Sequence, residues 1–86
     1  MKLVTVINAE YKQDYKILLK FNDGLTGTVD LTMYLEGEVF EPLKNKNYFK
    51  TFSVDSWTIG WRNGADFAPE FLYDLVNISN VSEPIV

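Results

Sequence analysis

The amino-acid sequence contains no cysteine and no histidine among its 86 residues. The lack of cysteine excludes disulfides, thiolate zinc sites and thiol nucleophiles, and the lack of histidine removes the commonest general base and metal ligand. The serines therefore have no histidine that could activate them as nucleophiles. We expect a protein without enzymatic activity, cofactor or metal site.

Carboxylates are the remaining candidates for acid–base chemistry, and two groups of them are closely spaced: Glu36, Glu38 and Glu41, and Asp66, Glu70 and Asp74. Such chemistry needs a concave site that shifts the pKa of the carboxyl groups. A domain this small needs its aromatic side chains for the core and rarely has such a cleft. We interpret both groups as solvated faces.

The sequence also lacks a long apolar run. No stretch approaches the roughly 20 apolar residues that span a bilayer, and the N-terminus leads directly into a strand-like segment without a signal-peptide pattern. We therefore expect a cytoplasmic protein that does not associate with membranes.

Clustered positive charge is missing as well. The chain has a net charge of −4, and Arg62 is the only cation after residue 50. Nucleic-acid-binding proteins neutralise phosphates with clustered lysine and arginine. We do not expect direct nucleic-acid binding.

What the sequence does contain is apolar material for one small domain, with 47% hydrophobic and 15% aromatic residues. The apolar pattern of the N-terminal part predicts three strands, at residues 3–9, 15–21 and 25–31. The last two are joined by Asn22-Asp23-Gly24, a sequence typical of hairpin loops.

The register of this hairpin follows from the apolar pattern. A three-residue loop pairs Ile17 with Val29 and Phe21 with Leu25, so the apolar side chains share one face. A two-residue turn would place the two apolar rows on opposite faces. We predict a three-residue loop with Gly24 in the left-handed conformation.

Strict alternation is lost over residues 31–50. A helical turn is predicted at residues 31–35, capped by Asp30 and ended by Gly37. The rest reads as a compact connection whose apolar side chains reach the core: Phe40, Leu43, Tyr48 and Phe49.

Two further strands are predicted, at residues 49–54 and 57–61. A short loop around Asp55-Ser56 pairs Phe52 with Ile59 and places Ile59 in one apolar row with Trp57 and Trp61.

A turn at Asn63-Gly64 and a helix that starts near Pro69 and ends near Asn77 complete the pattern. The predicted fold class is α+β, with an antiparallel sheet of about five strands, one C-terminal helix and a short helical connection in the middle. The helix and strands form a single compact domain over residues 1–77, and residues 78–86 form a polar C-terminal tail.

Several of these segments together resemble a bacterial family of small domains, domain of unknown function 2442. The similarity is carried by residues 14–24, Val29-Asp30-Leu31, residues 39–43 with Phe49 and, most specifically, residues 61–73. Relatives commonly have proline where Arg62 stands. The resemblance implies a β-rich fold without an assigned activity. It also implies that some relatives are joined to a helix-turn-helix domain, while others are encoded beside a second small protein in a toxin–antitoxin-like arrangement.

Residues 61–73 are the best candidate for a functional surface, although most of them have a structural explanation. Trp61 continues an apolar row, Gly64 suits a turn and Pro69 starts a helix, as Gly24 suits the first hairpin loop. Arg62 lies off the apolar row and has no inferred packing role. We expect Arg62, Asn63 and Asp66 to bind a partner, with an internal Arg62–Asp66 ion pair as the alternative.

The favoured function is a small cytoplasmic protein-interaction or accessory module without catalytic activity, such as an antitoxin-like partner of a genetically linked protein. The acidic C-terminal part would suit a basic partner. The alternative is a transcription-regulator-type domain that acts with a separate DNA-binding partner. A homodimer through a sheet edge is also compatible with the strand pattern.

Overall fold

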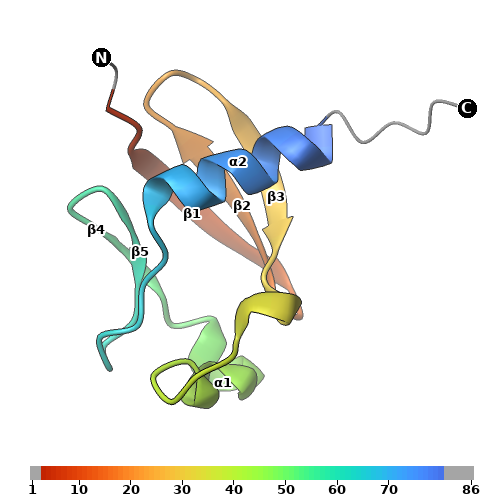
Figure 1. Cartoon of the computed structure of the whole chain (residues 1–86), viewed down its shortest axis with the longest axis vertical. Coiled ribbons are helices and arrows are strands. Elements are labelled where there is room, and N and C mark those ends of the chain that lie inside the picture. The colour runs from red at the N-terminus through yellow and green to blue at the C-terminus, as the bar shows by residue number, and fades with distance from the viewer. Residues whose placement is uncertain (1–2, 81–86) are drawn as a thin grey trace, which may run out of the picture.

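The computed structural model describes residues 3–80 (Figure 1). Its elements follow the order β1 (Val6–Gln13), β2 (Lys16–Phe21), β3 (Thr26–Asp30), the short 3-10 helices η1 (Thr32–Tyr34) and η2 (Glu41–Lys44), α1 (Lys46–Phe49), β4 (Ser53–Asp55), β5 (Thr58–Gly60) and α2 (Pro69–Asn80). The predicted α+β class is confirmed. The five strands are divided between a three-stranded sheet, β1-β2-β3, and a two-stranded sheet, β4-β5.

The β2–β3 hairpin has the predicted register. Ile17 lies opposite Val29, the Phe21 amide donates to the Leu25 carbonyl at 2.8 Å, and Gly24 has φ +96°. The prediction for β1 was wrong in its limits, because the strand runs over Val6–Gln13 instead of residues 3–9. Pairing with β2 continues as far as Gln13, since half-buried Ala9 and Tyr11 still face the apolar side chains of β2.

Helix α2 lies across one face of the three-stranded sheet (Figure 1). It buries Leu72 and Val76 completely, and the Tyr73 ring packs edge-on against the Phe21 ring, with 5.1 Å between the ring centroids. The helix continues to Asn80, past the predicted end near Asn77. No glycine or proline follows Asn77 until Pro84, so nothing in the sequence stops the helix there. The remainder of the predicted tail, residues 81–86, lies outside the described residues.

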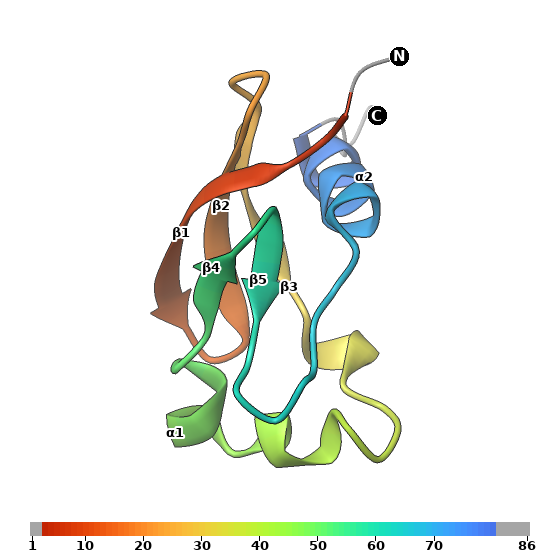
Figure 2. The same cartoon turned by 90° about the vertical axis from the view of Figure 1, so that its left-hand side faces the viewer.

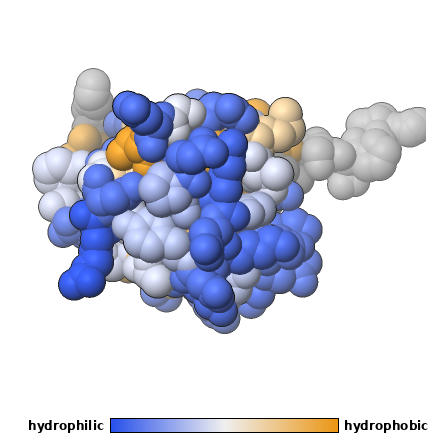
Figure 3. Space-filling model, turned by 90° about the horizontal axis from the view of Figure 1, so that it is seen from below, coloured by the Kyte–Doolittle hydropathy of each residue, from blue (hydrophilic) through white to orange (hydrophobic). Residues whose placement is uncertain are grey.

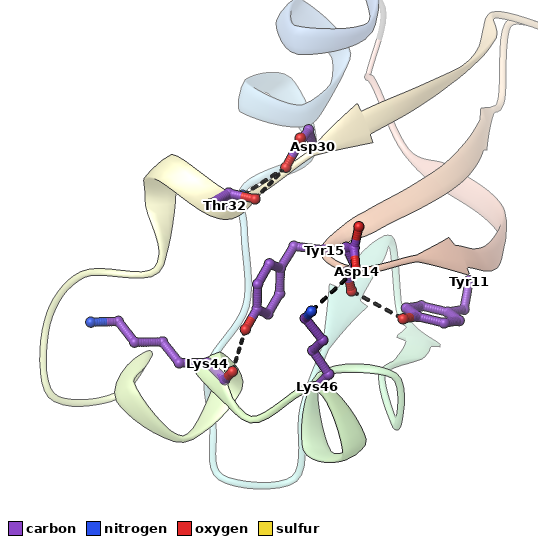
Figure 4. Close-up of polar contacts among 7 residues, drawn as sticks. All are labelled: Tyr11, Asp14, Tyr15, Asp30, Thr32, Lys44 and Lys46. Carbon is purple, nitrogen blue, oxygen red and sulfur yellow. Dashed lines mark hydrogen bonds and ion pairs between the residues drawn. The ribbon is translucent and has the colours of Figure 1, made fainter.

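The connection between β3 and β4 is tied to the main sheet by polar contacts (Figure 4). Asp30 Oδ1 accepts hydrogen bonds from the Thr32 amide at 3.0 Å and the Thr32 hydroxyl at 2.6 Å, and these bonds lower the pKa of Asp30. The Tyr15 hydroxyl donates to the Lys44 carbonyl, and Lys46 Nζ lies 3.2 Å from Asp14 Oδ1. The contact with Asp14 raises the pKa of Lys46. Leu43 and Phe49 are fully buried, as the compact connection requires.

The register predicted for the second hairpin was wrong. Val54, and not Phe52, lies opposite Ile59, and Asp55 lies opposite Thr58, so the turn comprises Ser56 and Trp57. This turn removes Trp57 from the predicted row: its side chain is 57% exposed, whereas Ile59 and Trp61 are buried. β5 is instead covered on both faces, because the buried Thr58 hydroxyl donates to the Phe67 carbonyl at 2.5 Å.

Candidate functional site

The turn after β5 is closed by its own backbone. The Trp61 amide donates to the Ala65 carbonyl at 2.8 Å, and the Gly64 amide donates to the Trp61 carbonyl at 3.0 Å. Gly64 has φ +94°, which glycine adopts without the strain that a Cβ would cause. The Trp61 indole donates to the Phe49 carbonyl at 2.7 Å, so this side chain joins the turn to the connection.

Asn63 is the most extensively bonded residue of this turn. Its Nδ2 donates to the Val39 carbonyl at 2.8 Å, and its Oδ1 accepts from the Ala65 amide at 3.1 Å. Its backbone amide donates to the Tyr48 hydroxyl at 3.1 Å. The Asn63 side-chain nitrogen and backbone amide therefore hold the turn against the connection, while its side-chain oxygen closes the turn itself.

Arg62 and Asp66 are exposed, and they do not form the alternative ion pair: within residues 3–80, no acidic group lies within salt-bridge distance of Arg62. The Asp66 backbone forms a bridge with Gly60. Together with the 31–50 connection, this turn forms the end of the molecule seen in Figure 3, which is mostly hydrophilic. The prediction that Arg62, Asn63 and Asp66 bind a partner remains a prediction.

All members of the two carboxylate groups singled out in the sequence are exposed. Glu41 lies 3.4 Å from Lys44 Nζ in a surface ion pair. Within residues 3–80, no three acidic side chains come together in an arrangement that could hold a metal ion. None of the helices in this part of the chain has the length and apolar character needed to cross a membrane.

A different surface, missed by the sequence analysis, surrounds the exposed indole of Trp57. Leu3, Val4, Trp57, Pro69 and Glu70 line a hollow of about 270 Å³ with mostly apolar walls. Three segments meet there: the residues before β1, the tip of the β4–β5 hairpin and the start of α2 (Figure 2). We call it the Trp57 hollow.

The hairpin tip is fixed in place at this hollow. The Val6 amide donates to the Trp57 carbonyl at 2.8 Å, which joins the tip to the start of β1. Leu3 is 67% exposed on the same wall, so two large apolar side chains are open to solvent beside each other. Neither side chain therefore belongs to the hydrophobic core. Their exposed apolar surface is of the kind that marks interaction sites.

One charged side chain lines the Trp57 hollow, the acidic Glu70. Between residues 51 and 80 as a whole, the exposed charged side chains are Asp55, Asp66, Glu70 and Asp74 against Arg62. A signal for the Trp57 hollow was present in the sequence, because Trp57 directly follows the turn-forming pair Asp55-Ser56. Its exposure could not be read from the pattern, because Trp57 alternates with Ile59 and Trp61 as a residue of one apolar row would.

Comparison with known proteins adds a family assignment. The sequence profile described as "Protein of unknown function (DUF2442)" matches residues 6–77. No curated protein and no solved structure matches the chain significantly. The match spans every strand and most of α2. The chain therefore belongs to the DUF2442 family.

Proposed function

We propose that the protein is a noncatalytic protein-binding module that holds an apolar side chain of a partner protein in the Trp57 hollow. The observation that carries this proposal is the exposure of Trp57, at 57%, on a hairpin tip beside a concave apolar surface. Tryptophan is enriched among the few residues that dominate binding energy at protein interfaces. A small domain that leaves this side chain outside its core forgoes burial that would stabilise it.

The residues that line the Trp57 hollow indicate which side chains of a partner would fit it. The apolar wall of Leu3, Val4 and Pro69 suits an aliphatic or aromatic side chain, and Glu70 at the rim suits a neighbouring lysine or arginine. A basic segment with one large apolar residue fits both features. An accessory or antitoxin-like role, in which the partner is the product of a linked gene, is the biological setting that we propose for this binding.

The test compares Trp57→Ala with Val39→Ala. Val39 is 42% exposed and lies in the connection away from the Trp57 hollow, so its variant removes apolar surface elsewhere. The probe is the purified product of the neighbouring gene, titrated against each protein by calorimetry. We expect affinity to fall by at least about tenfold for Trp57→Ala and to be unchanged for Val39→Ala.

Thermal denaturation of each variant provides the control for folding, and both midpoints should stay close to that of the wild type. Equal affinities of wild type and Trp57→Ala would contradict the proposal. The same titration with Arg62→Ala tests the earlier prediction for the turn at the opposite end of β5 (Figure 2). Loss of binding in Arg62→Ala alone would move the interface to that turn.

A duplex DNA titration examines the regulator alternative. The ion pairs of residues 3–80 join Lys12 to Glu10, Lys44 to Glu41 and Lys46 to Asp14. These lysines are partly neutralised, which weakens their attraction to phosphate. Salt-dependent binding to DNA by the isolated protein would favour a nucleic-acid-associated regulator over a purely protein-binding module.

A further inference from the structure

The outer edge of β3 is an open hydrogen-bonding surface. The Phe21 amide bonds the Leu25 carbonyl and the Leu31 amide bonds the Tyr15 carbonyl, so the odd-numbered residues from 25 to 31 face β2. In an antiparallel ladder the alternate residues point their backbone groups the other way. The amide and carbonyl groups of Thr26 and Thr28 therefore point outward, and within residues 3–80 they form no hydrogen bond.

The opposite edge of the same sheet is protected. β1 has irregular pairing at both ends, between Val6 and Asn8 and between Tyr11 and Gln13. Its start is occupied by the bond from Val6 to Trp57. Exposed Glu10 and Lys12 lie along the rest of β1. Bulges, charged side chains and covering segments are the usual devices that prevent edge-to-edge pairing.

β3 has almost none of these devices. Its sequence, Thr-Gly-Thr-Val-Asp, contains no lysine and no proline, and its pairing with β2 is regular throughout. Threonine favours extended structure, and Thr26 and Thr28 are both exposed. An open, regular edge of this kind can accept another strand by continuing the hydrogen-bond ladder.

Apolar side chains flank this edge. Met33, in η1 directly after β3, is 78% exposed, and Ile78, in the last turn of α2, is 61% exposed. Figure 1 shows that α2 crosses the sheet and that its last turn extends beyond β3. Both exposed apolar side chains therefore belong to elements that adjoin β3, one following it in sequence and one packed against it.

We infer that β3 pairs with β3 of a second copy of this chain, in an antiparallel two-fold dimer centred on Thr28. The strand is self-complementary in this register, because the outward amide and carbonyl of Thr28 meet those of the same residue in the second copy. Thr26 then lies opposite Asp30 of the second copy, so the two Asp30 carboxylates do not oppose each other.

This arrangement joins the two sheets into one continuous sheet with the α2 helices on the same face. The last turns of the two helices, including Ile78, approach each other across the two-fold axis. The Trp57 hollow is not part of the contact, since it is formed by the residues before β1, the β4–β5 tip and the start of α2. The dimer and the proposed partner binding are therefore independent of each other.

The experiment measures the mass of the full chain in solution by sedimentation equilibrium over a range of concentrations. We compare Thr28→Lys, which places a lysine opposite the same lysine of the second copy, with Gln13→Lys, which makes the same charge change on the β1 edge. We expect Thr28→Lys to weaken dimerisation by at least about tenfold and Gln13→Lys to leave it unchanged.

Amide hydrogen exchange of the wild type gives a second readout that does not depend on a variant. The Thr26 and Thr28 amides should become protected as concentration rises, while the Gly27 amide, which faces β2, should be protected at all concentrations. A protein that remains monomeric up to about 1 mM overturns the inference. A dimer that persists in Thr28→Lys, or one without concentration-dependent protection of Thr28, overturns it as well.

Discussion

The two hairpins of this molecule differ in what determines their structure. In β2–β3, alternating apolar residues and a glycine-containing loop fix the register locally, and every inward side chain of β2 is buried. In β4–β5, all three residues of β4 are exposed and the turn includes Ser56 at φ +63°. The second hairpin is held by contacts with distant segments: Val6 bonds Trp57, and Thr58 bonds Phe67. Local pattern specifies the first hairpin and tertiary contacts specify the second.

The largest expected effect tests whether both hairpins contribute equally to the core. Leu19 in β2 and Ile59 in β5 are both fully buried, so Leu19→Ala and Ile59→Ala should each lower the free energy of unfolding by about 2 to 5 kcal/mol. Urea denaturation measures both. Val54→Ala, at a 40% exposed position opposite Ile59, should cost less than about 1 kcal/mol. A small loss for Ile59→Ala would mean that the second hairpin is peripheral.

The next effect concerns the hydroxyl that fixes the second hairpin. Thr58→Val removes the buried hydrogen bond to the Phe67 carbonyl and should cost about 1 to 3 kcal/mol. Thr28→Val is the matched change in the first hairpin, at a position exposed in the single chain, and should stay within about 0.5 kcal/mol of the wild type when both are compared at concentrations where the chain is monomeric. Equal losses in chemical denaturation would contradict the contrast between local and tertiary control.

The two loops should differ in their response to a change at the left-handed residue. Gly24→Ala adds a Cβ at φ +96° and should cost about 1 kcal/mol, although the space around it is open. Ser56→Gly relieves a similar backbone strain at φ +63°, but glycine also raises the conformational entropy of the unfolded chain. The two effects oppose each other, so the net change in the free energy of unfolding should be within about 0.5 kcal/mol of zero. Thermal midpoints decide between these outcomes.

The smallest effect depends on pH. Hydrogen bonds from Thr32 lower the pKa of Asp30, so its carboxylate stabilises the fold above the ordinary carboxyl pKa of about 4 and loses this effect as pH falls through the lowered value. Asp30→Ala should cost less than about 1 kcal/mol at pH 7, because solvent screens this exposed group, and the cost should shrink in acid. Asp55→Ala is the control in the second hairpin, because the Asp55 carboxylate accepts no hydrogen bond from residues 3–80. A pH-independent cost for Asp30→Ala would contradict the assignment.

The sequence was informative wherever side-chain alternation and turn chemistry agreed. The register of β2–β3 and the start of α2 at Pro69 follow from such agreement. The second hairpin departs from its pattern because β5 is buried on both faces, by Ile59 in the core and by Thr58 beneath the segment that contains Phe67. No alternation can reveal a strand covered on both sides.

The candidate site was less predictable, because it depends on contacts between segments that are far apart in the sequence. Asn63-Gly64 indicated a turn, but the bonds from Asn63 to Val39 and Tyr48 join segments far apart in the sequence. The Trp57 hollow depends on the meeting of residues near positions 3, 57 and 69. Neither composition nor spacing places those positions together.

The hydrogen bonds of Asn63 also affect how readily this asparagine deamidates. An asparagine followed by glycine is prone to deamidation, in which the glycine amide nitrogen attacks the asparagine side-chain carbonyl carbon and ammonia leaves. In this turn the Gly64 amide donates to the Trp61 carbonyl, while the Asn63 side-chain amide is held at Val39 and Ala65. Cyclisation therefore requires this end of the molecule to open first. The amount of deamidated Asn63 in an old sample would record how often that opening has occurred.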